Sequence, residues 1–218
     1  MPDNNDRQNP SSLSRRQFLK GVGVVGAGSG LAAEMLGPEA EAAPAPLQKP
    51  PAGETLKPGM MPITLTVNGQ ASTMQVEPRT TLLNALRNHA EPPITGPKLV
   101  CDEGACGCCT VLVDGKTMYA CMLLAVDVVG KKITTIEGVA KDGKLSPVQQ
   151  AFVEKDAMMC GFCTPGLVMS VEAALHANPS ATLDQIKSAC AGNTCRCGTY
   201  PHIFEAAMSA ASKMRGGA

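Results

Sequence analysis

Ten cysteines, four of them crowded into the nine-residue stretch CDEGACGCC, constrain this chain more than any other feature. Thiols at this density are typical of a metal centre, a disulfide cluster or a redox-active dithiol. Aromatic residues make up only 3% of the 218 residues and Trp is absent, so the core must be aliphatic and rich in Met. A chain of this kind gains from a source of stability besides burial, and the cysteines are the obvious source.

The first 43 residues indicate an export signal. Arg15 and Arg16 precede Phe-Leu-Lys and a short run rich in Gly and Ala, and small residues suited to cleavage follow near Ala42 or Ala43. This layout is typical of a signal peptide and resembles the twin-arginine type, whereas the run is too short and glycine-rich for a membrane span. The sequence predicts twin-arginine export to the periplasm and a Pro-rich linker over 44–59. A disordered basic tail is the alternative.

Two classes of ligand are not predicted. Lys plus Arg and Asp plus Glu each number 19, and no basic cluster stands out beyond the N-terminus, which disfavours nucleic acid as a partner. The stretch from Gly21 to Gly26 matches the dinucleotide motif G-x-G-x-x-G. It follows a basic leader instead of a strand and opens no βαβ unit, so we reject it as a nucleotide site.

Two segments with different periodicities predict an α+β fold. Over 60–138 the sequence alternates as strands do, with hairpin turns at Asn68-Gly69 and Asp114-Gly115 and a short helix beginning at Thr80 or Thr81. Over 146–214 the pattern becomes helical, and 139–145 forms the boundary. Capping boxes and prolines predict four helices: Pro147–Lys155, Pro165–Ala177, Leu183–Ala189 and Pro201–Met214.

The first cysteine group has the pattern C-x4-C-x2-C followed by a fourth cysteine on the next predicted strand. Plant-type ferredoxins bind a [2Fe-2S] cluster with this spacing. Gly104 and Gly107 let the loop wrap tightly and leave amide groups free to bond sulfur. Adjacent residues of an extended chain point to opposite sides, so Cys108 is expected to be a small buried residue. The predicted ligands are Cys101, Cys106, Cys109 and Cys121.

A second cysteine group lies in the helical segment. The pairs CGFC and CRC, at predicted helix–loop junctions, can supply four thiolates to one site, and nearby helix N-termini would stabilise its negative charge. Cys190 lies within a helical run and is expected to pack instead of binding. The predicted ligands are Cys160, Cys163, Cys195 and Cys197.

Three other chemistries explain fewer cysteines. A thioredoxin-like dithiol needs a βαβ pattern around CGFC, and a zinc site made from two of the close pairs leaves four cysteines unexplained. Disulfides suit an exported chain and are the most serious rival. The crowded C-x4-C-x2-C and C-x-C cysteines pair poorly with one another, and twin-arginine export carries folded, cofactor-loaded proteins. Two [2Fe-2S] clusters are therefore predicted.

The motifs CDEGACGCCTVLVDG, MCGFCTPG and GNTCRCGTY together resemble the iron–sulfur (small) subunit of molybdenum hydroxylases, and most of all that of exported aldehyde oxidoreductases. The resemblance covers about residue 60 to the C-terminus, and the signal. It implies a β-grasp, plant-type ferredoxin-like domain followed by a four-helix [2Fe-2S]-binding domain.

The resemblance also implies a direction of electron transfer. In this family a large subunit binds molybdopterin and hydroxylates the substrate, here aldehyde to carboxylic acid. Electrons then pass through the helical-domain cluster and the ferredoxin-like cluster to FAD on a medium subunit. Cys197 is implied to lie nearest the pterin. The family often has Gln before CGFC, where it contacts the pterin, but Met159 stands there and lacks an amide. No substrate site or catalytic residue is implied on this chain.

Two alternatives remain. A free-standing exported ferredoxin-like shuttle should be monomeric and strongly charged, whereas a subunit should present an apolar interface on its helical domain; the neutral net charge favours the subunit. A disulfide-bonded binding module should be colourless. The histidines, His89, His176 and His202, are scattered and are expected to be surface or packing residues.

Overall fold

The computed structural model describes residues 59–216. The predicted signal peptide over 1–43 and almost all of the predicted linker over 44–59 lie outside these residues. Among the helices of the described range, none combines the length and the apolar character needed to cross a bilayer.

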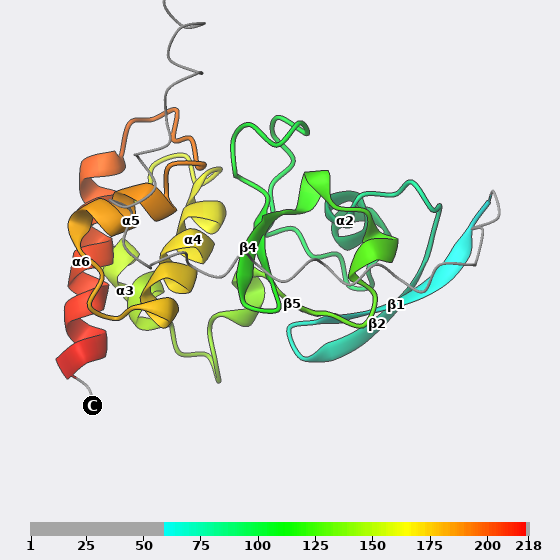
Figure 1. The fold of residues 1–218 in the computed structure, drawn as a ribbon, viewed down its shortest axis with the longest axis horizontal. Coiled ribbons are helices and arrows are strands. Elements are labelled where there is room, and N and C mark those ends of the chain that lie inside the picture. Colours follow the sequence, from blue (N-terminus) through cyan, green and yellow to red (C-terminus); the bar gives the residue numbers. More distant parts are fainter. Residues whose placement is uncertain (1–58, 217–218) are drawn as a thin grey trace, which may run out of the picture. The chain divides into compact units, whose positions relative to one another are not determined.

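A five-stranded mixed sheet forms the first part of the described chain, with the strand order β2-β1-β5-β3-β4 (Figure 1). Strands β1 and β5 pair in parallel, and the other neighbours pair antiparallel. The strands are β1 (Met61–Val67), β2 (Gln70–Val76), β3 (Thr110–Val113), β4 (Lys116–Tyr119) and β5 (Lys132–Thr134).

Both predicted hairpin turns are confirmed. Asn68 and Gly69 have φ values of 53° and 81°, and Asp114 and Gly115 have values of 50° and 80°. Positive φ at both central residues is the requirement of a type I′ turn, and Asn-Gly and Asp-Gly meet it at little steric cost. The turns fix the register of β1 on β2 and of β3 on β4.

A short helical segment packs with the sheet. It consists of α2 (Leu82–Asn84) and a π-helical turn, η1 (Ala85–His89), and the side chain of Thr81 caps it by accepting from the Asn84 amide at 3.3 Å. Its leucines are fully buried with Leu65 and Val111 of the sheet. Three short 3₁₀ turns complete this part: η2 (Ala120–Met122), η3 (Ala125–Val128) and η4 (Ile136–Gly138).

Four helices form the second part, at the predicted places. They are α3 (Pro147–Glu154), α4 (Thr164–Ala177), α5 (Leu183–Ala189) and α6 (Tyr200–Gly216). Ser146 with Gln149 and Thr182 with Gln185 form the two predicted capping boxes. Each box satisfies backbone N–H groups that have no partner within the helix.

The two parts have separate apolar cores, and adjacent residues of one loop belong to different cores. Cys109 is buried in the core of the sheet, whereas Cys108 is buried in the core of the helices. Helix α4 packs against β3 and β4, so it is the helix that adjoins the sheet (Figure 1). The predicted α+β fold is confirmed.

Candidate metal centres

Three cysteines of the first group, Cys101, Cys106 and Cys109, lie on an irregular loop between η1 and β3. The backbone φ is positive at Asp102, Gly104 and Gly107, with values of 56°, 76° and 67°, so the chain turns sharply between the cysteines. A Cβ added at Gly104 would lie 2.9 Å from Met122 Cγ, which shows how closely the loop approaches that side chain. The predicted tight path of the loop is therefore present.

The four predicted thiols of this group come together in two pairs. Cys101 interacts with Cys106, and Cys109 interacts with Cys121. The first pair is half-buried and the second is buried. Cys121 reaches the loop from the 3₁₀ turn η2, directly after β4, and not from the strand on which the sequence had placed it. The chain turns at that point, and this turn brings the thiol toward Cys109.

Backbone amides surround the first pair. The backbone amide of Glu103, together with the Cys106 thiol and the amides of Cys106 and Ala105, lowers the pKa of Cys101 to about 7. The same N–H groups would stabilise the negative charge of a metal–thiolate group. Burial has the opposite effect on Cys109, whose thiol pKa it raises to about 12.

The second cysteine group brings two loops together. Cys160 and Cys163 lie at the start of α4, and Cys195 and Cys197 lie between α5 and α6. The thiols again meet in pairs, Cys160 with Cys197 and Cys163 with Cys195. The first of these pairs is exposed and the second is buried.

Residues that the sequence analysis did not single out hold this second site. The Tyr200 hydroxyl accepts from the Cys195 amide at 2.8 Å and donates to the carbonyl of Asn193 at 3.1 Å. Burial raises the pKa of Cys195, but hydrogen bonds with Thr199 and Cys163 outweigh this and bring it to about 7. Both Asn193 and Tyr200 belong to the motif GNTCRCGTY, so their position close to two cysteines could have indicated that they support the site.

A backbone hydrogen bond connects the two sites. The amide of Thr194 donates to the carbonyl of Cys106 at 2.9 Å. Thr194 is bonded covalently to Cys195, so one hydrogen bond joins a predicted ligand of one site to the residue beside a ligand of the other. Tyr119 adds a bond from its hydroxyl to the carbonyl of Gly192 at 3.0 Å.

The two remaining cysteines are buried. Cys190 is 2% exposed in the helical core, and burial raises the pKa of its thiol to about 11. Cys108 is 3% exposed, and burial, followed by the neighbouring Cys106, raises its pKa to about 12. Both thiols are therefore protonated at neutral pH, as is typical of packing residues.

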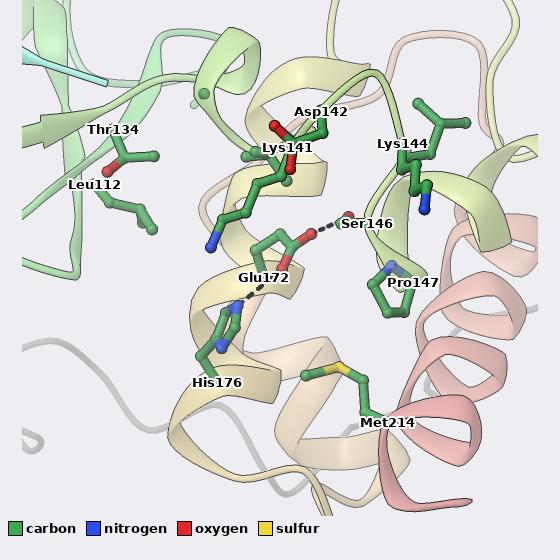
Figure 2. A pocket seen from close by; sticks show the side chains of 13 residues that line it. Leu112, Thr134, Lys141, Asp142, Lys144, Ser146, Pro147, Glu172, His176 and Met214 are labelled. Carbon is green, nitrogen blue, oxygen red and sulfur yellow. Dashed lines mark hydrogen bonds and ion pairs between the residues drawn. The ribbon is translucent and has the colours of Figure 1, made fainter. Parts of the chain in front are cut away.

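A cavity of about 680 Å³ offers a different kind of site (Figure 2). It is lined by the carboxylate of Glu172, which is 5% exposed, and by Lys141 and Lys144. Ser146 donates to one oxygen of Glu172, and Nε2 of His176 lies 3.3 Å from the other. Since both oxygens have partners and no cysteine lines the cavity, we interpret Glu172 as a link between the start of α3 and helix α4.

The thiol arrangement fits binuclear iron–sulfur clusters. The predicted ligands interact as Cys101 with Cys106, Cys109 with Cys121, Cys160 with Cys197 and Cys163 with Cys195. In a [2Fe-2S] cluster each iron takes two protein thiolates. Two pairs at each site, with backbone N–H groups directed at sulfur, match this demand.

Comparison with protein families gives the same assignment. The family described as "2Fe-2S iron-sulfur cluster binding domain" matches residues 66–161, and "[2Fe-2S] binding domain" matches residues 135–208. The "TAT (twin-arginine translocation) pathway signal sequence" matches residues 12–32, so the predicted twin-arginine signal is confirmed.

Curated relatives define the class more narrowly. The "Aldehyde oxidoreductase iron-sulfur-binding subunit PaoA" of Escherichia coli is 38% identical over 94% of this chain and 90% of its own length. The "Nicotine 6-hydroxylase small subunit" of Paenarthrobacter nicotinovorans is 45% identical over 68% of this chain and 88% of its own length.

Solved structures agree with these relatives. A chain of quinoline 2-oxidoreductase from Pseudomonas putida 86 matches with a TM-score of 0.68 and 38% identity, covering 72% of this chain and 98% of that chain. Aldehyde oxidoreductase from Desulfovibrio gigas matches with a TM-score of 0.67 and 34% identity, over 73% of this chain and 18% of that chain.

This chain belongs to the family of iron–sulfur subunits of molybdenum hydroxylases. It carries [2Fe-2S] clusters and transfers electrons as one component of an oxidoreductase complex. The predicted class of protein, its cofactors and its general function are therefore confirmed.

Proposed function

We propose that eight cysteines hold the two clusters, four in a domain over 60–138 and four in a domain over 146–214. The pairing of the thiols supports this assignment, because each site offers two pairs and leaves Cys108 and Cys190 buried and protonated. The first cluster takes Cys101, Cys106, Cys109 and Cys121, and the second takes Cys160, Cys163, Cys195 and Cys197.

The chain's own residues connect the two sites. A bound [2Fe-2S] cluster supplies a carrier for one electron at a time. The hydrogen bond from the Thr194 amide to the Cys106 carbonyl, 2.9 Å long, provides a short covalent and hydrogen-bonded connection between the second site and the first. The buried thiol of Cys108 lies 3.9 Å from the same Cys106 carbonyl, beside this connection.

Exposed apolar side chains border both sites and support two different docking faces. Met159 and Phe162, beside the second site, are 77% and 56% exposed. Leu99, Val100 and Met122, around the first site, are 53%, 52% and 61% exposed. Large apolar side chains gathered at an opening are typical of a surface that a partner covers.

The second site would face a molybdopterin-binding large subunit, and the first would face an FAD-binding medium subunit. The exposed pair Cys160 and Cys197 supports this order, because it is the least covered of the four pairs. Cys197 would then lie nearest the pterin. Met159, which is exposed and directly precedes Cys160 in the chain, would contact the large subunit by apolar packing, since a thioether cannot reproduce the hydrogen bonds of an amide.

The complex would oxidise an aldehyde to a carboxylic acid in the periplasm. The identity to the aldehyde oxidoreductase subunit of Escherichia coli over 94% of this chain supports the substrate class, and the twin-arginine signal supports the compartment. Substrate specificity would lie in the large subunit, and this chain would contribute no substrate contact.

One observation carries the proposal. The second site has an exposed thiol pair, Cys160 and Cys197, and a buried pair, Cys163 and Cys195. The residue before Cys195 is hydrogen-bonded to Cys106 of the first site. The test is to purify the complex from a periplasmic extract and add an aldehyde without any other reductant. Two electron paramagnetic resonance signals of reduced [2Fe-2S] clusters should appear. Signals that appear only with dithionite would indicate a free-standing shuttle, and a protein without iron would indicate disulfides.

A further inference from the structure

One buried amide, that of Asn193, links the loop of the first thiol site to the helical domain. Its Nδ2 donates to the carbonyl of Gly107 at 2.8 Å and to Oγ1 of Thr110 at 3.2 Å. Its Oδ1 accepts from the hydroxyl of Ser170 at 2.8 Å. Asn193, Thr110 and Ser170 are 4%, 2% and 3% exposed, so water does not compete for these bonds.

The donors and acceptors of this network fit in one way only. The hydroxyl of Thr110 donates to the Gly107 carbonyl at 2.6 Å, which leaves its own oxygen free to accept from Asn193. The amide uses both N–H groups on the loop and its oxygen on Ser170. An aliphatic residue would leave the Ser170 hydroxyl without this partner, and a carboxylate would offer no donor to Gly107.

Close backbone approach makes this contact sensitive to small changes. A Cβ added at Gly166 of α4 would lie 2.2 Å from the carbonyl oxygen of Gly107, and one added at Gly107 would lie 2.5 Å from that of Gly192. The two domains therefore touch through backbone at this point. Because the two backbones are so close here, the side-chain amide of Asn193, which bonds to both domains, determines the distance between the two loops.

We propose that Asn193 is a positioning residue that fixes the separation of the two thiol sites, and thereby the rate at which an electron crosses between them. It lies two residues before Cys195, and the carbonyl it binds belongs to the residue after Cys106. One electron leaves one site and enters the other, and no bond forms or breaks. This inference rests on the proposed function, because it assumes that both sites carry clusters.

The test compares Asn193→Asp with Asn178→Asp in the complete, iron-loaded complex. Asp keeps the shape of the side chain and an acceptor for Ser170 but removes both N–H donors to the loop. Asn178 is exposed at the end of α4, where its Oδ1 accepts from the Ser180 amide at 2.9 Å, a bond that Asp can also make. The control therefore adds the same charge without touching the contact between the sites.

Two measurements report on the separation. With both clusters reduced, the magnetic splitting between their paramagnetic resonance signals falls steeply with distance, and we expect a narrower splitting in Asn193→Asp alone. Exchange of the Thr194 amide hydrogen, which bonds to Cys106, should also become about tenfold faster, the factor expected for the loss of a buried hydrogen bond. The Ile203 amide in α6 should exchange as before.

Unchanged splitting and unchanged exchange in Asn193→Asp would overturn the inference. If that variant fails to retain iron, Thr110→Val is the second test, because it removes one of the two bonds that Nδ2 of Asn193 donates and keeps the shape of the side chain. A narrower splitting in Thr110→Val supports the inference, and an unchanged one overturns it. Absence of two cluster signals in the unaltered protein would instead overturn the proposed function, so the two failures can be distinguished.

Discussion

The two thiol sites have the same number of cysteines, but one is formed mainly by a single loop and the other by two segments far apart in the sequence. The first takes three of its cysteines from one glycine-containing loop, whose own amides lower the pKa of the Cys101 thiol. The second brings together two segments far apart in the sequence, and a side chain, Tyr200, orders the Cys195 backbone. The outer thiol pair is half-buried at the first site and exposed at the second.

This difference indicates that the second site depends more on cover by a partner than the first does. A loop that encloses its thiols with its own backbone needs little cover, whereas the exposed pair Cys160 and Cys197 is bordered by Met159 and Phe162. Burial of such a surface by another subunit would remove water from around the outer thiols and strengthen electrostatic interactions there. We therefore expect changes at the two sites to have separable effects.

The largest effects should follow from removing one thiolate at each site. Cys106→Ser should abolish the signal of the first cluster and electron delivery to the acceptor, while molybdenum stays bound to the complex. Cys163→Ser should abolish the signal of the second cluster. Each variant should hold about two iron atoms per chain instead of about four, as measured by elemental analysis.

The matched control is Cys190→Ala, which removes a buried thiol that belongs to neither group. It should keep both signals and all the iron. Loss of both signals from Cys106→Ser would contradict the separate roles of the two sites.

A methyl group at Gly107 should be much more damaging than one at Gly161. Both glycines have positive φ, 67° and 83°, so both substitutions strain the backbone to a similar extent. The added Cβ meets the Gly192 carbonyl at Gly107 and nothing within 4 Å at Gly161. Gly107→Ala should therefore lower the free energy of unfolding by about 2 kcal/mol more than Gly161→Ala, measured by denaturant titration. Equal losses of unfolding free energy in the two variants would show that the close contact between the loops does not contribute to stability.

A charge placed on either apolar rim should release one partner and spare the other. Met159→Glu should weaken binding of the molybdenum subunit about tenfold, and Met122→Glu should do the same for the flavin subunit. The contents of molybdenum and FAD in the purified complexes measure the two effects separately. If both variants lost the same partner, the assignment of one docking face to each site would fail.

The smallest effect concerns stability at alkaline pH. The pKa of Cys190 is raised to about 11 in the folded chain, so above about pH 9 the unfolded chain releases this proton first. Its contribution to stability is therefore complete below pH 9 and declines as the pH rises. Between pH 8 and pH 10 the free energy of unfolding of the unaltered chain should fall by about 1 kcal/mol more than that of Cys190→Ala. Parallel pH profiles in thermal unfolding would contradict this.

Local rules accounted for most of the fold. The Asn-Gly and Asp-Gly turns, the two capping boxes and the helix-starting prolines act over four or fewer residues, and each lies where it was predicted. The placement of Cys121 on a strand was wrong because β4 ends at Tyr119 and a 3₁₀ turn follows, a boundary that depends on packing. The strand order, with β5 between β1 and β3, depends on long-range pairing that no local pattern encodes.

Spacing predicted which cysteines gather but not how the two sites touch. The C-x4-C-x2-C loop is local, so its geometry follows from its own residues. The bonds from Asn193 to Gly107 and from Thr194 to Cys106 join residues more than eighty positions apart. Such contacts arise only when both domains have folded, which explains why their importance was not visible in the sequence.

The central claim is that this chain carries electrons from a molybdenum partner through two clusters. Its most direct test is the ratio of molybdenum to iron in complexes purified under mild conditions from the periplasm. We expect about one molybdenum for every four iron atoms, since two [2Fe-2S] clusters contribute four. Iron without molybdenum would contradict it in favour of a free-standing shuttle, and a protein with neither metal would contradict the assignment of the clusters themselves.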